Sequence, residues 1–414
     1  MSDLKFTTES IANGYLRRDG QKGIRNKVLV IYTVNCASQP AKRIAAHFRT
    51  AGQDVDVLGC ESSRANQMLI RTLLCFINHQ NIGAVLAIGH GDEETSAEQL
   101  AAFAEKIGKP SGYFFVQELG SEKSYEKGIQ IVRDMLEKIK DTPRVPIYIK
   151  DLVFGGECGG SDFTSGLAAN PLVGSFFDSA VDCGGTAMFE EICEAIGLRD
   201  YLISRCANER AAKEIAYTYD KSFKDSVSGG QFSISPGNMH GGLTSIEEKS
   251  MGAVAKSGSR PIQGVVKVTH KPPRPGLWYM DCTGDGGKGC GFGGSGDASS
   301  TLLFLATGAH MTFLTSGRGH ITGNPVGPII KVTGNARTYH NLEEDIDINA
   351  SSLINGQKPM EQMTQETFDL VCRVADGELT KGEKTGHYEC VMGNMLQNPW
   401  VLPEDAKNME APNE

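Results

Sequence analysis

A glycine-rich stretch in the middle of the chain, GGECGGSDFTSG at residues 155–166, carries four chemically active side chains: Glu157, Cys158, Ser161 and Asp162. Each glycine costs a helix about 1 kcal/mol relative to alanine, so the stretch predicts a shaped loop instead of a regular helix. A carboxylate and a thiolate beside accessible glycine backbone could bind a metal ion or a substrate. The alternative is a tight turn in which Asp and Ser cap the following helix.

Further reactive groups follow three β-branched runs in the first 150 residues. Asn35 and Cys36 come after the first run, Cys60 and Glu61 after the second, and His90 after the third. Ligands of parallel sheets gather at the carboxyl ends of the strands. We therefore expect Asn35 to bind substrate and Cys36 and His90 to be metal ligands. His90 could instead act as a base or only hydrogen-bond its neighbours.

The stretch TSGRGHITGN at residues 315–324 combines two hydroxyls with a guanidinium. Arg318 could bind a carboxylate through two hydrogen bonds, while Thr315 and Ser316 hold further oxygens of the same ligand. The alternative is a surface turn with a solvated arginine. Lys249, in the stretch TSIEEKSMG, is a further candidate for substrate binding.

The run MDCTGDGGKGCGFGGSGD at residues 280–297 contains a GxGxxG pattern at Gly284, Gly286 and Gly289. A dinucleotide site would need a shorter loop and an acidic residue at the end of the next strand, which here ends in TSGRG. A loop that encloses a metal or a substrate explains the run better. Asp281, at the end of the preceding strand, is then a candidate metal ligand.

The chain has 414 residues, a net charge of −9 and 40% hydrophobic residues, as expected of an ordinary soluble protein. This charge gives no basic field for nucleic acid or an anionic membrane, so neither is expected as a partner. No secretory signal is visible, and the longest apolar run, residues 301–314, is too short to span a bilayer. A cytoplasmic location is expected by default. The eleven scattered cysteines, without any CxxC pair, predict free thiols.

Apolar strands alternate with amphipathic helices up to about residue 145, which predicts an α/β domain of the Rossmann or flavodoxin type, with three layers around a parallel sheet. A larger mixed α/β catalytic domain is expected over residues 146–400, followed by a frayed tail at 401–414. Within the larger domain, CGGTAMFEEICEAIG at 183–197 suggests a glycine turn and an acidic helix. Reactive groups at strand ends in both halves predict a site in the cleft between the two domains.

Several stretches, in this order, resemble the altronate and galactarate dehydratase family over residues 14–355. They are GYLRRDGQKGIRNKVLVIYTVNC, ECGGSDFTSGLAANP, SPGNMHGGLTSIEEKSMGAVAKSG, TSGRGHITGNPVGPIIKVTGN and DIDINAS. The chain departs from the pattern at MDCTGDGGKGCGFGG, where sugar-acid members usually read MDTPG. It departs again at FEEICE (189–194), where many members read SETPE. Both departures fall where substrate specificity would be set.

The resemblance implies a metal-dependent β-elimination from a 2-hydroxycarboxylate, with a divalent ion, usually Fe2+, as cofactor. Mn2+ and Zn2+ are alternatives. Sugar-acid members remove water from an aldonate or aldarate and form a 2-keto-3-deoxy acid. A branch similar to the large subunit of sulfolactate sulfo-lyase expels sulfite instead. A nucleotide-dependent oxidoreductase that uses the GxGxxG run is the remaining enzymatic alternative.

Site residues are assigned from their chemistry. The catalytic candidates are Glu157, Asp162, His90 and Arg318. The metal-ligand candidates are Glu157, Cys158, Cys36, His90 and Asp281. The substrate-binding candidates are Asn35, Ser161, Thr315, Ser316, Arg318 and Lys249.

Partner chains are expected as well. Many members of the family carry a small SAF domain before the GYLRxDG block, and others keep it on a separate chain. Because the matching block starts at Gly14 here, we expect a separate small SAF-domain subunit and an oligomeric enzyme.

Overall fold

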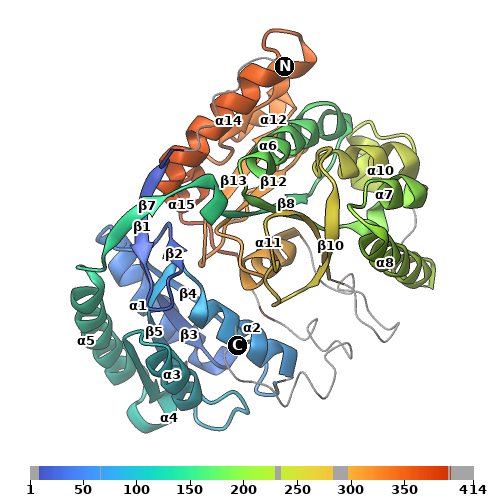
Figure 1. The fold of residues 1–414 in the computed structure, drawn as a ribbon. Helices are drawn as coiled ribbons and strands as arrows, with labels where there is room; N and C mark the ends of the chain where they lie inside the picture. The colour runs from blue at the N-terminus through green and yellow to red at the C-terminus, as the bar shows by residue number, and fades with distance from the viewer. Residues whose placement is uncertain (1–8, 66, 229–234, 283–296, 390–391, 393–414) are drawn as a thin grey trace.

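The computed structural model describes residues 9–65, 67–228, 235–282, 297–389 and 392, and it contains two α/β domains (Figure 1). The first is built on a four-stranded parallel sheet with strand order β4-β3-β5-β6. The strands are β3 (Lys27–Tyr32), β4 (Val55–Gly59), β5 (Ile82–Gly89) and β6 (Ser111–Phe115). Nearly every residue of β3, β4 and β5 is buried, as expected for strands covered on both faces.

Four helices cover this sheet in two layers. Side chains of α1 (Ser38–Thr50) and α5 (Ser121–Ile139) share one apolar cluster with one face of the strands. Those of α2 (Gln67–Asn78) and α3 (Ala97–Lys106) share another cluster with the opposite face. The short α4 (Val116–Leu119) precedes α5. The predicted three-layer parallel α/β architecture is confirmed.

The second domain has a seven-stranded parallel sheet with strand order β10-β11-β9-β8-β12-β13-β14. The strands are β8 (Val153–Cys158), β9 (Thr186–Phe189), β10 (Ile262–Lys267), β11 (Gly276–Asp281), β12 (Met311–Thr315), β13 (Ile329–Thr333) and β14 (Ile348–Asn349). Here the prediction of an acidic helix within 183–197 was wrong, because the stretch forms a strand and a 3-10 turn, Ile192–Glu194. The residues TAMF form β9, and all four are buried between β8 and β11.

Helices lie on both faces of this second sheet. Those that follow the first half of the sheet are α6 (Asn170–Asp182), α7 (Arg199–Ser204), α8 (Glu209–Ser228), α9 (Pro236–His240) and α10 (Ile246–Ala255). Those of the second half are α11 (Asp297–Ala306), α12 (Ala336–Asn341), α13 (Ser351–Ile354), α14 (Met360–Ala375) and α15 (Lys381–Thr385). The helices α6 and α14 pack in one apolar cluster, and α11 packs in another on the opposite face.

The two domains pack directly against each other. The helix α2 of the first domain packs against α11 of the second, and their side chains belong to one continuous apolar cluster. A small antiparallel sheet, β2-β1-β7, adds a second connection. It consists of β1 (Ala12–Leu16), β2 (Lys22–Gly23) and β7 (Arg144–Ile147), and it runs between the domains in Figure 1. No helix among the described residues is long and apolar enough to cross a lipid bilayer.

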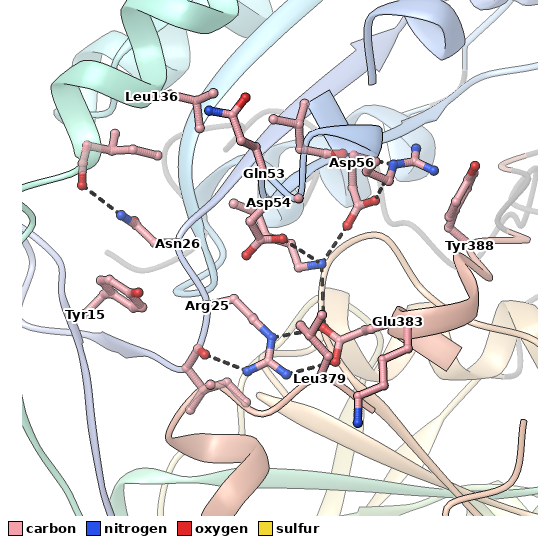
Figure 2. A pocket seen from close by; sticks show the side chains of 18 of the residues that line it. Tyr15, Arg25, Asn26, Gln53, Asp54, Asp56, Leu136, Leu379, Glu383 and Tyr388 are labelled. Carbon is pink, nitrogen blue, oxygen red and sulfur yellow. Dashed lines mark hydrogen bonds and ion pairs between the residues drawn. The ribbon is translucent and has the colours of Figure 1, made fainter. Parts of the chain in front are cut away.

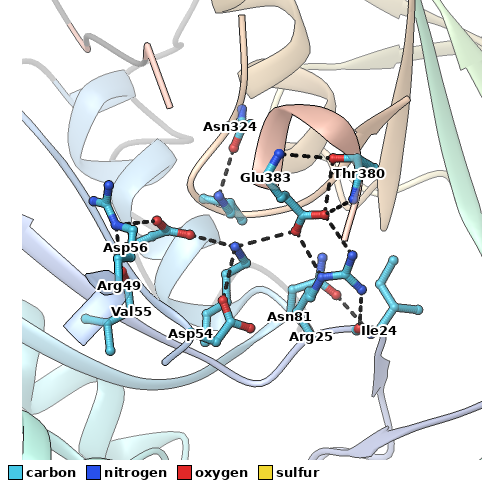
Figure 3. A network of polar contacts seen from close by, with 12 residues as sticks. Ile24, Arg25, Arg49, Asp54, Val55, Asp56, Asn81, Asn324, Thr380 and Glu383 are labelled. Atoms are coloured by element: carbon cyan, nitrogen blue, oxygen red, sulfur yellow. Dashed lines mark hydrogen bonds and ion pairs between the residues drawn. The ribbon is translucent and has the colours of Figure 1, made fainter. Parts of the chain in front are cut away.

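A buried ionic network fastens α15 to the start of the first sheet (Figure 3). The Arg25 guanidinium donates to both carboxylate oxygens of Glu383, at 2.9 and 2.8 Å. The ammonium group of Lys27 lies 2.6 Å from Asp56, 3.3 Å from Asp54 and 3.8 Å from Glu383. Burial alone would raise the pKa of Glu383, but the Arg25 and Lys27 cations lower it to about 2. This carboxylate therefore ties the two domains together by charge.

A cavity of about 800 Å³ opens beside this network (Figure 2). Lys27 and Val55, the first residues of β3 and β4, both line it. Substrates of parallel sheets bind at the opposite, carboxyl ends of the strands. The cavity thus belongs to the domain junction. A candidate active site is instead expected at the carboxyl ends of the strands.

Replacing Glu383 with Gln should destabilise the protein by about 3–5 kcal/mol at neutral pH, because the buried Arg25 cation loses its paired carboxylate and Lys27 loses one of three. The folded pKa of Glu383 is about 2, below the ordinary value, so its contribution is complete above about pH 5 and is lost as the pH falls toward 2. Urea denaturation should therefore show a difference between wild type and Glu383→Gln that is large at pH 7 and smaller at pH 3.

Glu378→Gln is the matched control, since Glu378 pairs with Arg373 at the surface, where an ion pair contributes at most about 1 kcal/mol. Equal destabilisation by the two substitutions would contradict the assignment of a buried interdomain clamp.

Candidate metal centre

The glycine motif begins inside a strand. The residues GGEC form the end of β8, so the predicted loop starts only after Cys158. A Cβ atom on Gly155 would lie 2.5 Å from Cγ of Phe304, and one on Gly156 would lie 2.8 Å from Cε2 of Phe177. The two glycines therefore leave room for the aromatic rings of α11 and α6, which lie directly against the strand.

The strand directs its two chemical groups to opposite faces of the sheet. Successive side chains of a strand alternate. Glu157 shares the face of Gly155, toward α11, whereas Cys158 shares the face of Gly156, toward α6. The two adjacent residues that the sequence suggested as joint metal ligands thus diverge.

The neighbouring strand β9 ends at the same level as β8. Gly156 pairs with Phe189, so the residues after β9 emerge beside Cys158. Glu191 follows two residues later and has a φ of 73°, a left-handed conformation that few non-glycine residues adopt. Strained backbone of this kind clusters at functional sites, where the surrounding structure holds it in place. A 3-10 turn, Ile192–Glu194, continues from it.

These two strand ends bring Cys158, Glu191 and Glu194 together. Each offers one ligand atom, and the three atoms lie within 4.8 Å of one another. The Cys158 thiol donates to Oε2 of Glu191 at 3.2 Å. Cys158 is 2% exposed and Glu191 is 8% exposed, whereas the side chain of Glu194 is 26% exposed, so the group opens toward solvent on the Glu194 side.

This donor set suits a divalent transition metal. One thiolate with two carboxylates favours iron or zinc over magnesium or calcium, which prefer oxygen ligands alone. Two lysines also reach the group: Lys256 forms an ion pair with Glu191, and Lys249 forms one with Glu194. Cys36, His90 and Asp281, the other ligands expected from the sequence, are not members of this cluster.

A second acidic group lies on the opposite face of β8. Burial and the neighbouring Glu190 carboxylate raise the pKa of Glu157 well above its ordinary value. Burial, with the carboxylates of Glu190, Asp281 and Glu157, likewise raises the pKa of the Cys282 thiol. The Oε2 atom of Glu157 has no hydrogen-bond partner among the described residues. Protonated, low-charge forms are therefore favoured on this face.

Within the described part of the chain, the site residues predicted in the first domain make no hydrogen bond or ion pair with the cluster of Cys158, Glu191 and Glu194. Asn35 and Cys36 are exposed in a 3-10 turn, Asn35–Ala37, that follows β3. Nδ1 of His90 lies 3.1 Å from the carboxylate of Asp92 and 3.1 Å from the amide nitrogen of Gln117. These partners of His90 all belong to the first domain, which matches the alternative that it hydrogen-bonds its neighbours.

Asp162 and Ser161 begin the turn into the next helix. Oδ1 of Asp162 accepts from the backbone N–H groups of Thr164 and Ser165 at 2.8 and 3.1 Å, and its Oδ2 accepts from Asn335 at 2.9 Å. These are the contacts of a capping residue, the alternative considered for this motif. Ser161 is buried, and its carbonyl accepts from Asn238 at 3.0 Å.

The loop after β12 lies over the glycine motif. The backbone N–H of Arg318 donates to the carbonyl of Gly160 at 2.9 Å, and its exposed guanidinium donates to the carbonyl of Gly237. Ser316 Oγ accepts from the N–H of Gly319 at 2.9 Å. Thr315 is fully buried and donates to Asn170. Of these three side chains, only that of Arg318 is presented to solvent beside the motif.

Two further predictions concern the segment around residues 281–289, of which the structure describes only the start. Asp281 ends β11, and its carboxylate lies 3.5 Å from the ammonium group of Lys221. The glycines of the GxGxxG pattern, at 284, 286 and 289, lie outside the described residues.

A pocket of about 290 Å³ lies between the residues after β8 and helix α10. It is lined by Ser161, Asp162 and Lys249, three of the predicted site residues, and by apolar side chains that include Phe163 and Met251. Lys249 also forms an ion pair with Glu194, so this residue connects the pocket to the cluster. A small acid in this pocket would lie beside the candidate metal ligands.

Comparison with known proteins shows the family. Residues 149–397 match the family model described as the C-terminal part of D-galactarate/altronate dehydratase, and residues 14–140 match the second domain of D-galactarate dehydratase/altronate hydrolase. The chain belongs to the D-galactarate/altronate dehydratase family. The resemblance stated from the sequence blocks is confirmed.

Three relatives illustrate the range of activities in this dehydratase family. The subunit beta of (2R)-sulfolactate sulfo-lyase from Chromohalobacter salexigens is 29% identical over 392 residues, 93% of this chain and 97% of that protein. Altronate dehydratase of Escherichia coli is 31% identical over 91% of this chain and 76% of its own length. Altronate dehydratase of Bacillus subtilis is 27% identical, with the same two coverages. All three relatives are lyases, and the expectation of a lyase is confirmed.

Sequence reasoning missed Glu191, Glu194 and Lys256. The signal was present in FEEICE at 189–194, where glutamates directly follow an apolar run. Read as the end of a parallel strand, TAMF would have placed those glutamates beside Cys158.

Replacing Gly155 with Ala should destabilise the protein by about 1–3 kcal/mol, because the added methyl would meet the buried ring of Phe304 at 2.5 Å and push α11 away from β8. Thermal unfolding measures this change. Gly237→Ala is the control, since the nearest atom to its new methyl would be Nη1 of Arg318 at 3.4 Å. A wild-type Tm for Gly155→Ala would contradict the packing described for β8.

Proposed function

We propose that the chain is the catalytic component of a metal-dependent lyase that removes water from a 2-hydroxycarboxylate and produces a 2-keto-3-deoxy acid. The observation that carries this proposal is the cluster of Cys158, Glu191 and Glu194 at the carboxyl ends of two parallel strands, in a chain of the dehydratase family. The substrate class is a sugar acid, an aldonate or aldarate, as the names of the altronate and galactarate dehydratase relatives suggest.

The reaction breaks two bonds. A base removes the proton α to the carboxylate, and the electron pair of that C–H bond forms an enediolate. The hydroxyl on the β carbon then leaves with a proton as water, and the resulting enol becomes the keto acid. The α proton is weakly acidic, so the enediolate needs strong electrostatic stabilisation. A divalent cation held by Cys158, Glu191 and Glu194 would supply that stabilisation, with Fe2+ as the expected ion and Mn2+ or Zn2+ as alternatives.

Two of the predicted substrate-binding residues, Arg318 and Lys249, have a part in this proposal. Arg318 binds the substrate carboxylate from the loop above Gly160, and Lys249 presents a cation to the pocket beside the cluster. Both cations offset the net charge of −9, which would otherwise repel an anionic substrate. The catalytic roles of Glu157, Asp162 and His90 stay predictions.

Release of sulfite is the second candidate function. The sulfo-lyase subunit beta matches this chain over 97% of its length, whereas the two altronate dehydratases match over 76% of theirs. In that reaction a C–S bond breaks in place of the C–O bond, and sulfite departs with the electron pair. The first step, proton removal next to a carboxylate, is the same.

A separate small subunit is part of the proposal. The relative whose length this chain matches is named as a subunit, which indicates a partner chain in that enzyme. For the chain described here we propose a small partner subunit, of the SAF type that the family resemblance implies.

A panel of 2-hydroxy acids tests the proposed function. We expect a 2-keto acid to form from an aldonate or aldarate in the presence of Fe2+, activity to disappear after chelation, and Fe2+ to restore it. A colorimetric 2-keto-acid assay, run together with sulfite detection on sulfolactate, distinguishes the two leaving groups. The assay is repeated with candidate small-subunit chains added, to test whether a partner subunit is required for activity. Full activity after exhaustive chelation would contradict the metal-dependent mechanism.

Replacing Arg318 with Lys should lower kcat/KM by about ten- to a hundredfold, because lysine keeps the charge but loses the planar pair of donors that fits a carboxylate. The Tm should change little, since the side chain is exposed. Steady-state kinetics on the best substrate of the panel measures the effect. Arg337→Lys, another exposed arginine on the nearby α12, is the control. Wild-type kinetics for Arg318→Lys would show that Arg318 does not bind substrate.

A further inference from the structure

Helix α10 delivers two cations to the candidate metal ligands. Lys249 lies within α10 and Lys256 caps its carboxyl end, seven residues later. Seven residues are about two helical turns, so the two side chains project from the same face of the helix. Lys256 pairs with Glu191, and Lys249 pairs with Glu194. Both carboxylates of the cluster are therefore matched by ammonium groups from one element.

Lys256 engages the sulfur ligand as well. Its ammonium group donates to Sγ of Cys158 at 3.3 Å while it pairs with Glu191. The side chain of Lys256 is 1% exposed, and a buried ammonium is tolerated only when it has good partners. A single positive charge thus contacts two of the three candidate ligands, as a bound cation would.

The backbone of α10 is fixed close to the site. A Cβ atom on Gly252 would lie 2.9 Å from Cα of Gly166, so the two backbones touch at this point. Nδ2 of Asn170 donates to the carbonyl of Gly252 at 2.9 Å. Because the helix is held in this way, the lysine side chains, and not the helix, must move when the ligands change partners.

We propose that Lys249 and Lys256 are built-in counter-ions of the metal centre. They hold the cluster in its ligand geometry before a metal binds, and the metal must displace Lys256 from Cys158 and Glu191 in order to enter. This inference rests on the metal centre proposed above. Two consequences follow: the lysines weaken metal binding through repulsion between like charges, and they stabilise the metal-free fold.

Titration of the chelator-treated full chain with Co2+ tests the proposal. Thiolate-to-Co2+ charge-transfer absorbance reports occupation of the site, and Tm reports stability of the metal-free protein. Lys256→Met should bind Co2+ about tenfold more tightly, or tighter still. Its metal-free form should melt at a lower temperature than wild type, and Co2+ should restore the Tm. Lys213→Met, at an exposed surface pair of α8, is the control and should change neither quantity.

The outcomes separate the two proposals. If wild type gives the charge-transfer band but Lys256→Met binds Co2+ no more tightly, the counter-ion proposal is overturned and the metal centre stands. If neither wild type nor any variant gives the band, the metal centre falls and the counter-ion proposal falls with it. Should Lys256→Met not fold, Lys249→Met carries the same test, with tighter Co2+ binding expected and unchanged binding as the contradiction.

Discussion

The parallel pairing of β8 with β9 brings the carboxyl ends of these strands side by side in the middle of the seven-stranded sheet, and the candidate site depends on this pairing. It places Cys158 3.2 Å from Glu191 although 33 residues separate them in sequence. The two glycines of β8 make the pairing compatible with tight packing, because rings from α6 and α11 occupy the space that side chains would fill. A change in register of one residue would exchange the faces of Glu157 and Cys158.

The alternation of side chains along β8 separates two kinds of environment. On the α6 face, Cys158 and Glu191 meet the buried ammonium group of Lys256. On the α11 face, Glu157 and Glu190 lie together, and the pKa of Glu157 is raised by burial and by that neighbour. The Lys256 cation acts to lower the pKa of Glu157, but burial and the Glu190 carboxylate outweigh it. The strand thus directs Cys158 and Glu157 into different surroundings within one site.

Much of the first domain could be predicted from the sequence, because its strands are continuous apolar runs between long amphipathic helices. The apolar run VDVLG forms β4, and the amphipathic stretch AEQLAAFAEK forms α3, in line with the predicted alternation of strands and helices. The strand TAMF was harder to predict. Four buried residues carry no periodicity that separates a strand from the start of a helix, and the glutamates that follow resemble a helical face. The site was predicted in part for the same reason: Cys158 was named, whereas Glu191 and Glu194 were not.

The sequence also could not predict which of the reactive side chains at the strand ends come together in the folded protein. Reactive residues at strand ends in both domains suggested a site between them, but the described partners of the cluster come from the second domain, and α2 and α11 pack together between the sheets. Strand order and the contact between domains decide which strand ends meet, and neither follows from local patterns.

X-ray absorption spectroscopy of the zinc-loaded protein tests the central claim most directly, because it reports the atoms bound to the metal without reference to turnover. The account predicts one sulfur scatterer at about 2.3 Å together with oxygen or nitrogen ligands near 2.0–2.2 Å, and loss of the sulfur shell in Cys158→Ser. A first shell of oxygen and nitrogen alone in wild type, or a sulfur shell that persists in Cys158→Ser, would contradict it.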